Sequence, residues 1–268
     1  MDQLIVNAAL TGCVAHKADN PALPVTPEEV AADARRCADE GAAIFHVHAR
    51  DRHGNATFGT GTYRRYVDAV REAVPGAIVC ASTSGRHFTD FEERAQSLYA
   101  KPDMASLTLG SVDFEHGSGT YSRSQVRAML RRMLDLGVKP EFEAFDLGHA
   151  YRLRDLVAEF EDDLEWPYAN LILGVHLPPT REVFYPIMQQ FEEDATWSAT
   201  SVGRGAEIVQ RWAIAFGAHV RVGLEDSLWM DKGVPATNPA LVARAVAFGR
   251  SLGREPATFE QAREELGL

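Results

Sequence analysis

The stretch IFHVHARD, residues 44–51, has the pattern of a buried β-strand that ends in polar groups. Successive side chains of a strand point to opposite faces, so His46 and His48 share one face while Phe45 and Val47 take the other. Two imidazoles therefore point into the same space. The arginine and aspartate that follow mark the point where the strand passes into a loop.

A helical pattern precedes this strand, in TPEEVAADARRCADEG, residues 26–41. Thr26 can cap the helix, Pro27 suits its first turn, and Glu29 completes a capping box. Gly41 stands where the left-handed residue that ends a helix is expected. The sequence therefore predicts a helix followed directly by a strand.

The same alternation continues along the whole chain. Strands that alternate with helices pair in parallel, and eight such units predict a closed (β/α)8 TIM barrel rather than an open doubly wound sheet. The eight candidate strands are LIVNAALTG (4–12), AIFHVHA (43–49), AIVCASTSG (77–85), MASLTLGS (104–111), KPEFEAFDLG (139–148), LILGVHL (171–177), WSATSVG (197–203) and HVRVGLED (219–226).

One domain accounts for residues 1–268, because α/β barrels routinely reach about 250 residues as a single unit. The pattern NPALVARAVAFGRSLG, residues 238–253, predicts a late helix with Asn238 as its N-cap. The tail REPATFEQAREELGL, residues 254–268, predicts a C-terminal helical extension that lies against a neighbour such as another subunit.

The composition limits the classes of partner. With a net charge of −11 there is no basic stripe for phosphates, so we expect no nucleic acid and no membrane as partner. No apolar run approaches the roughly 20 residues that cross a bilayer. Cys13, Cys37 and Cys80 have no paired spacing, and the N-terminus MDQLIVNAAL lacks the features of a signal peptide. These features predict a reduced, cytoplasmic protein.

Unusual polar residues follow most of the predicted strands. The active site of a (β/α)8 barrel lies at the C-terminal ends of its strands, so these residues should meet there. They are His46, His48 and Arg50 on the second strand, Ser82, Ser84 and Arg86 on the third, Ser106 and Thr108 on the fourth, Glu141, Glu143 and Asp146 on the fifth, and Arg221, Glu225 and Asp226 on the eighth.

Two histidines and one carboxylate form a candidate metal set. The eighth strand closes the barrel beside the first, so Glu225 can approach His46 and His48. Three ligands leave positions open for water or substrate, as in a catalytic zinc site, although the set also suits other divalent ions. Two strand histidines taken alone are more often a hydrogen-bonded core feature. The adjacent carboxylates Glu225 and Asp226 favour the metal, because a cation would compensate their repulsion.

In its motifs the chain resembles the β-keto acid cleavage enzymes, a family that includes the 3-keto-5-aminohexanoate cleavage enzyme. The likeness covers essentially the whole chain, and HVHARD with RVGLED is its most specific part. The matching motifs are LTG (10–12), NPALPVTPEE (20–29), HVHARD (46–51), STSG (82–85), MASLTLGSVDF (104–114), PEFEAFDLGH (140–149), RVGLED (221–226) and GREPATFEQARE (253–264).

The resemblance implies a zinc-dependent TIM barrel, usually a homotetramer, that converts a β-keto acid and acetyl-CoA into acetoacetate and a new CoA ester. It assigns the zinc to His46, His48 and Glu225. It makes Asp226 the general base, with Arg221 and Ser82 as a relay. A carboxylate is a weak base toward the α-carbon of a thioester, so Asp226 would need a dry site with nearby donors.

The resemblance also implies the residues that bind the keto acid, namely Gly85 and Ser106, and we expect Thr108 on the same strand to join them. Relatives that act on an amino-substituted keto acid carry a glutamate where this chain has Val14. A cationic tail would lose its counter-charge here, so we expect a neutral, apolar or anionic tail. Arg86 suits either a second carboxylate of the substrate or a CoA phosphate.

The same residues are also compatible with two other functions. A zinc hydrolase on the same barrel would attack a small ester, lactone or amide through a metal-activated water, with Asp226 as proton shuttle and without acetyl-CoA. The second alternative is a non-catalytic, metal-dependent protein that binds a small carboxylate. A serine, an arginine and a spare aspartate around an open metal are more than such binding requires.

Overall fold

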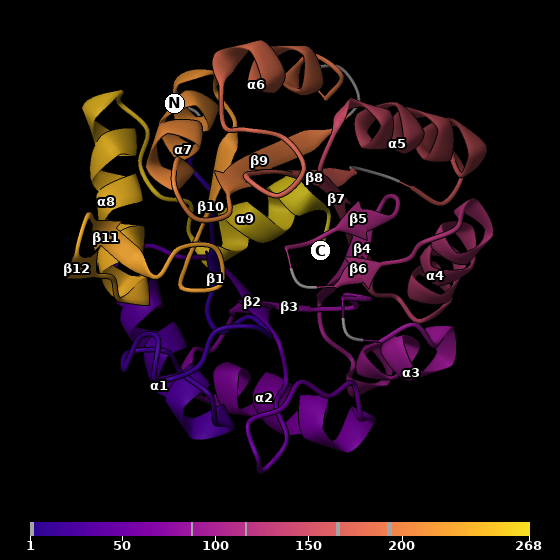
Figure 1. Ribbon diagram of the computed structural model, residues 1–268, viewed down its shortest axis with the longest axis horizontal. Helices are drawn as coiled ribbons and strands as arrows, with labels where there is room; N and C mark the ends of the chain where they lie inside the picture. Colours follow the sequence, from indigo (N-terminus) through magenta and orange to yellow (C-terminus); the bar gives the residue numbers. More distant parts are fainter. Residues whose placement is uncertain (1–2, 87, 116, 165–166, 192–194) are drawn as a thin grey trace.

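The computed structural model describes residues 3–86, 88–115, 117–164, 167–191 and 195–268. Within these residues eight parallel strands close into a barrel in the order β1-β10-β9-β8-β7-β4-β3-β2, and the helices surround it (Figure 1). The predicted (β/α)8 fold is confirmed. The barrel strands are β1 (Val6–Ala9), β2 (Ile44–Val47), β3 (Ile78–Ala81), β4 (Met104–Thr108), β7 (Lys139–Ala144), β8 (Tyr168–Leu173), β9 (Thr196–Ser201) and β10 (His219–Val222).

The outer layer consists of helices that follow the strands in the chain. Most are amphipathic, and their apolar faces cover the outward side chains of the strands. They are α1 (Pro27–Asp39), α2 (Thr60–Ala73), α3 (Phe91–Ala95), α4 (Arg123–Asp135), α5 (Leu147–Glu159), α6 (Arg181–Met188), α7 (Ala206–Ala215) and α8 (Asn238–Ser251), with a 3-10 turn, η1 (Gln96–Ala100), after α3. None of the helices in the described part of the chain has the length and apolar character that a membrane span requires.

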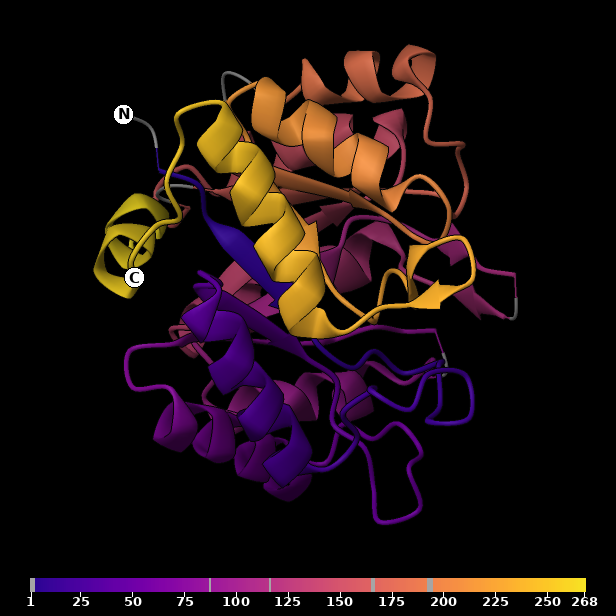
Figure 2. The ribbon, with the colours of Figure 1, turned by 90° about the vertical axis from the view of Figure 1, so that its left-hand side faces the viewer.

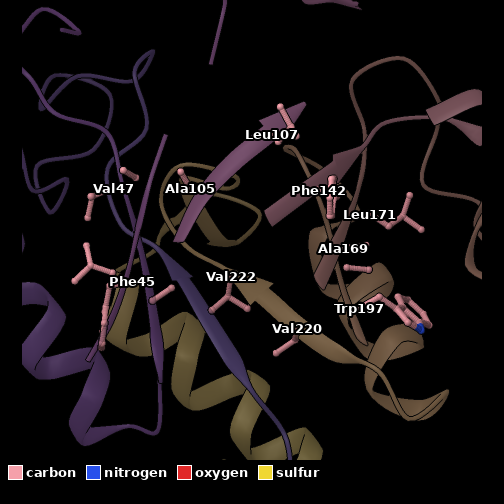
Figure 3. Close-up of a cluster of buried hydrophobic side chains, with 14 of the residues drawn as sticks. Phe45, Val47, Ala105, Leu107, Phe142, Ala169, Leu171, Trp197, Val220 and Val222 are labelled. Atoms are coloured by element: carbon pink, nitrogen blue, oxygen red, sulfur yellow. The ribbon is translucent and has the colours of Figure 1, made fainter. Parts of the chain in front are cut away.

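Alternation along the strands divides the core into an inner and an outer part. Phe45, Val47, Phe142 and Val222 are buried and face outward, where they pack between barrel and helices (Figure 3). Their neighbours in sequence point into the barrel. Because His46 lies between Phe45 and Val47 on β2, the same alternation directs it into the barrel.

The N-cap of α1 agrees with the sequence, and that of α8 does not. Thr26 and Glu29 form the predicted capping box. At α8 the cap is Thr237, whose side chain accepts the Ala240 N–H. Asn238 is instead buried and ties two loops together. Its amide donates to Leu10 O at 2.8 Å and its oxygen accepts the N–H of Leu224 at 2.7 Å. The prediction that Asn238 caps the helix was wrong, because tertiary contacts of its side chain outweigh the local role.

The C-terminal extension closes one end of the barrel. Helix α9 (Phe259–Leu266) lies across that end, behind the centre of the barrel in Figure 1 and apart from the other helices in Figure 2. Its buried residues Ala262 and Leu266 join a cluster with Ile44 and Ile78 from inside the barrel. The tail therefore packs against its own chain, whereas the sequence suggested a neighbour such as another subunit.

Two hairpins stand at the opposite end, where the strands finish. They are β5 (Val112–Asp113) with β6 (Ser118–Gly119), and β11 (Trp229–Asp231) with β12 (Val234–Pro235). Figure 2 shows β11 and β12 on the far side of the molecule from α9. One end of the barrel is thus plugged, and loops and hairpins surround the other.

Candidate active site

The predicted metal ligands meet at the open end of the barrel. His46 Nε2 lies 3.7 Å from Glu225 Oε2, and His48 Nε2 lies 3.1 Å from Glu225 Oε1. One ligand atom from each of the three residues lies within 4.8 Å of the others. His46 is buried on the inner side of β2, His48 is buried directly after that strand, and Glu225 comes from the turn after β10.

Backbone geometry brings Glu225 to this position. Its N–H donates to Ala9 O at 3.2 Å, so the turn after β10 is fastened to the end of β1. Gly12, in the loop after β1, has a φ of 61° and faces Glu225 closely. A Cβ atom on Gly12 would lie 2.9 Å from Glu225 Cγ. A side chain at this position would push the carboxylate away from the histidines.

The carboxylate of Glu141 lies beside the other ring nitrogen of His46. His46 Nδ1 lies 3.3 Å from Glu141 Oε2. Glu141 is fully buried and also accepts hydrogen bonds from Asn7 at 2.7 Å and from the thiol of Cys80 at 3.3 Å. A carboxylate on the far nitrogen of a metal-binding histidine fixes its tautomer and leaves the other nitrogen free as a ligand.

Three buried polar atoms at this point make no hydrogen bond in the described part of the chain, namely His46 Nδ1, His46 Nε2 and Glu225 Oε2. His46 Nδ1 lies at ion-pair distance from Glu141, whereas His46 Nε2 and Glu225 Oε2 face each other. Unsatisfied buried polar groups are costly, so their convergence requires a partner. A divalent cation would satisfy both atoms together with His48, and two imidazoles with one carboxylate are a common donor set for zinc.

His46, Cys80 and Glu141 also lie close enough together to bind a metal ion. The two sets differ in what their atoms already contact. Glu141 is satisfied by Asn7, Cys80 and His46, in the closed interior of the barrel. His48 and Glu225 instead line an open cavity. The geometry therefore favours the set of His46, His48 and Glu225.

Arg221 on β10 organises the carboxylates beside this set. Its Nε donates to Asp226 Oδ2 at 3.0 Å, and its Nη2 donates to Asp226 Oδ1 at 3.1 Å and to Glu225 Oε1 at 2.8 Å. Nη1 lies 3.5 Å from Glu143 Oε1. A fork of this kind fixes the orientation of a carboxylate as well as its charge. Thr200 adds a hydroxyl 3.3 Å from Asp226 Oδ2.

Burial and neighbouring charges shift the pKa values of these groups in opposite directions. Burial and the charge of Glu225 raise the pKa of Asp226, against the opposing effect of Arg221. Burial would also raise the pKa of Glu225, but His48 and Arg221 hold it well below its usual range. Burial opposes the protonation of His48, yet Glu225 raises its pKa to about 10. The pKa values of two adjacent carboxylates are thus shifted in opposite directions.

An open cavity of about 460 Å³ lies above these groups, and we call it the central cavity. Several predicted site residues line it. They are His48, Ser82, Arg86, Thr108, Arg221, Glu225 and Asp226. Catalytic, metal-set and substrate candidates from different strands therefore share one space.

Three predicted substrate residues lie elsewhere. Ser106 is buried, and its Oγ accepts the N–H of Thr83 at 3.3 Å. The N–H of Gly85 donates to Tyr121 Oη. Val14 is 42% exposed and is not among the residues that line the central cavity. The loop after β1 contributes Cys13 to the lining instead.

Sequence reasoning gave no role to several groups that the structure brings into the site. Glu141 and Glu143 stood out as polar residues on a strand, and their alternation was the available signal. Asn7 and Thr200 carried no such signal, because Asn7 is a single polar residue in β1 and Thr200 is one of several hydroxyl residues in β9. Phe114, from the β5–β6 hairpin, lines the central cavity through a tertiary contact that no local pattern reveals.

Fold and site together define the class of the protein. A (β/α)8 barrel with acid–base groups and an open set of candidate metal ligands at the C-terminal ends of its strands has the arrangement of a TIM-barrel enzyme. A buried arginine pairs with two carboxylates beside that set.

Comparison of the sequence with known families gives the specific assignment. The family model described as beta-keto acid cleavage enzyme matches residues 3–268, and the chain belongs to this family. It is 34% identical to the 3-keto-5-aminohexanoate cleavage enzyme of Fusobacterium nucleatum over 273 residues, which cover 100% of this chain and 99% of the relative. It is 33% identical to the 3-oxoadipate:acetyl-CoA acetyltransferase of Cupriavidus necator over 270 residues, covering 98% and 94% of the two chains.

Solved structures confirm the fold. A ternary complex of ObcA with a C4-CoA adduct and oxalate superposes with a TM-score of 0.79 at 20% identity, over 92% of this chain and 68% of that chain. At this identity the likeness concerns the architecture of the barrel.

Proposed function

We propose that the protein exchanges acyl groups between a β-keto acid and acetyl-CoA, giving acetoacetate and the CoA ester of the remaining acyl group. The convergence of the unpartnered His46 Nε2 and Glu225 Oε2 beside the Arg221–Asp226 pair carries this proposal. The names of relatives that cover the whole chain, among them an acetyl-CoA acetyltransferase, support it.

His46, His48 and Glu225 would hold a zinc ion, with Glu141 behind His46. When bound, zinc supplies Lewis-acid polarisation of the keto and carboxylate oxygens of the substrate. The chain itself orients the ligands and closes the lower end of the barrel to water. The donor set alone also accommodates other divalent ions.

The balance of atoms identifies the proton that must leave. Acetoacetate contains C1 and C2 of the keto acid joined to the acetyl group, so the new bond forms between C2 and the carbonyl carbon of acetyl-CoA. C2 must therefore lose a proton first. This places the proton transfer on the keto acid, and not on the thioester α-carbon considered from the sequence. Asp226 lines the central cavity, and its raised pKa brings it closer to that of a useful base.

The remaining steps need no redox partner. Addition of C2 to the thioester expels the CoA thiolate, which then attacks the original ketone carbon. Cleavage between C2 and C3 releases the new CoA ester, and C2 recovers its proton from Asp226. Arg221 keeps the Asp226 carboxylate in one orientation through two hydrogen bonds. Ser82, which lines the same cavity, offers a hydroxyl for proton relay and for binding the substrate.

Gly85, Ser106 and Thr108 remain our candidates for holding the keto acid, with Thr108 the one that lines the central cavity. Val14, which lies outside the lining, remains our candidate for the tail preference. We further propose a homotetramer in the cytoplasm. Light scattering of the purified protein would test the assembly, with a mass of four chains as the expected result.

The decisive assay combines metal-loaded protein, acetyl-CoA and β-keto acids of varied tail charge, with acetoacetate and the new CoA ester measured by mass spectrometry. We expect both products, in equal amounts and only with acetyl-CoA present. Asp226→Asn should lower turnover at least about 100-fold, because the variant has no base for C2.

Arg35→Ala, on the exposed face of α1, is the control variant and should retain full activity. Turnover of esters, lactones or amides without acetyl-CoA, and no acetoacetate from any keto acid, would contradict the proposal in favour of a hydrolase. Binding of small carboxylates without any turnover would indicate a binding protein.

A further inference from the structure

Arg86 places a positive charge in the central cavity. It lies in the loop after β3 and lines the cavity. Its Nε is buried and has no hydrogen-bond partner within the described structure, and its guanidinium carbon lies 4.2 Å from the ring centroid of Phe114. Among the described residues no carboxylate comes within ion-pair distance of it.

Arg221, the other arginine that lines the central cavity, is paired with carboxylates. Arg221 contacts Glu143, Glu225 and Asp226. Asp113 and Glu115 flank Phe114 and also line the cavity, yet neither pairs with Arg86. Arg86 is therefore held against an aromatic ring, with nearby acids that do not neutralise it.

A second arginine beneath the same loop adds a positive charge. Arg94 on α3 is 1% exposed, and its Nε also lacks a partner in the described structure. Its guanidinium lies 4.8 Å from the ring centroid of Tyr121, and its Nη1 would lie 3.1 Å from a Cβ on Gly85. A buried guanidinium without a carboxylate is unfavourable unless an anion approaches. The loop from Ser82 to Arg86 thus lies beside two guanidinium groups that form no ion pair among the described residues.

The position of Arg86 identifies the part of the substrate that it can reach. A narrow hollow beside the central cavity shares Cys13, His48, Ser84 and Arg86 with it. Arg86 therefore lines the same two hollows as His48, one of the candidate metal ligands, and can reach a keto acid that binds beside it. Carboxylates fit the planar fork of a guanidinium through two parallel hydrogen bonds.

We propose that Arg86 selects β-keto acids whose tail carries a second carboxylate. This inference rests on the proposed function, because it assigns a substrate class to the same site. Arg86 binds the distal carboxylate, and Arg94 strengthens the local positive potential from behind the loop. Carboxylate and phosphate share the anionic chemistry that Arg86 recognises, so the test must separate the keto acid from CoA.

The test compares kcat/KM for a 3-oxo dicarboxylic acid with that for a 3-oxo monocarboxylic acid of equal chain length. We expect wild-type protein to favour the dicarboxylic acid, and Arg86→Gln to reduce this preference by about 10- to 100-fold, the usual effect of losing a hydrogen-bonded charge. Arg86→Lys should recover part of it, since charge remains and the fork is lost. Arg52→Gln, an exposed arginine in the preceding loop, is the control and should keep the wild-type ratio.

Two further experiments distinguish failure of this inference from failure of the proposed function. Acetyl-pantetheine in place of acetyl-CoA removes the nucleotide phosphates; an Arg86→Gln defect that vanishes with it would overturn the inference in favour of CoA phosphate. Calorimetric titration with glutarate, an unreactive dicarboxylate, does not depend on turnover. Binding that weakens in Arg86→Gln supports the inference even if no keto acid reacts. Equal preference in wild type and Arg86→Gln, with normal turnover, would overturn it and leave the proposed function intact.

Discussion

Glu141 shows how much a single residue inside the barrel contributes to the site. Three groups converge on its carboxylate, namely His46 Nδ1, the amide of Asn7 and the thiol of Cys80. Burial would raise the pKa of Glu141, but His46 and Arg221 lower it below its ordinary value. The residue thus remains charged in the interior and can fix the ring of His46.

Glu141→Gln should weaken metal binding. The amide keeps the size of the side chain but loses the charge that orients His46, and changes of this kind reduce metal affinity by about 10- to 100-fold. Competition with a chromophoric chelator measures the affinity directly. Glu161→Gln, at an exposed position, is the matched control. An unchanged metal affinity in folded Glu141→Gln would show that the contact is not needed.

At the scale of elements, α9 is joined to the barrel by polar contacts as well as by its apolar face. Arg263 on α9 and Arg71 on α2 both bind the carboxylate of Asp103, at 3.0 Å and 2.9 Å. Asp103 also accepts the N–H of Val79 on β3 at 3.0 Å. One carboxylate before β4 therefore connects three separate elements.

Asp103→Asn should destabilise the protein at neutral pH and much less in acid. Burial would raise the pKa of Asp103, but the Val79 N–H and the two arginines lower it. A depressed pKa contributes stability above the unfolded value, near 3.8, and this contribution is lost as pH falls through the folded value. We expect a loss of about 1–3 kcal/mol at pH 7 by urea unfolding, shrinking below pH 4.

Asp39→Asn is the control for this change, because Asp39 forms an exposed ion pair with Arg35 on α1. Its effect should stay within about 0.5 kcal/mol at every pH. A difference between Asp103→Asn and wild type that is constant from pH 7 to pH 3 would contradict the charge-based account.

Some features of the helices and strands could be predicted from local sequence patterns, and others could not. The strand at residues 44–47 and the capping box of α1 depend on neighbours in sequence, so they could be predicted. Thr237 and Asn238 can both cap a helix, and only the contacts of Asn238 with Leu10 and Leu224 decide between them. The sequence also could not predict which surface α9 packs against. An amphipathic helix requires an apolar partner surface, but its pattern does not identify that surface.

For the whole molecule, the two ends of the barrel have different tasks. One end is filled by α9, and the other carries the cavity and the metal set. A ligand that binds only the folded state stabilises it, by about 2.7 kcal/mol at one hundred times its dissociation constant. Metal binding at the open end should therefore be detectable as stability of the entire chain.

Removal of divalent ions by a chelator should lower the melting temperature by about 5–10 °C, and added zinc should restore it. His46→Ala should show no such response, because it lacks a ligand. Differential scanning calorimetry of both proteins, with and without zinc, provides the measurement. A zinc-dependent rise of the same size in His46→Ala would place the metal elsewhere.

The barrel and most of the residues at its open end could be predicted from local patterns, because strand alternation and helix caps depend on neighbours in sequence and the ends of parallel strands must meet. The remaining features depend on tertiary contacts. It placed Glu141 behind His46, directed α9 beneath its own barrel, left Val14 outside the cavity and set Arg86 against Phe114. These outcomes depend on side chains that are distant along the chain, and no local pattern encodes which of them come into contact.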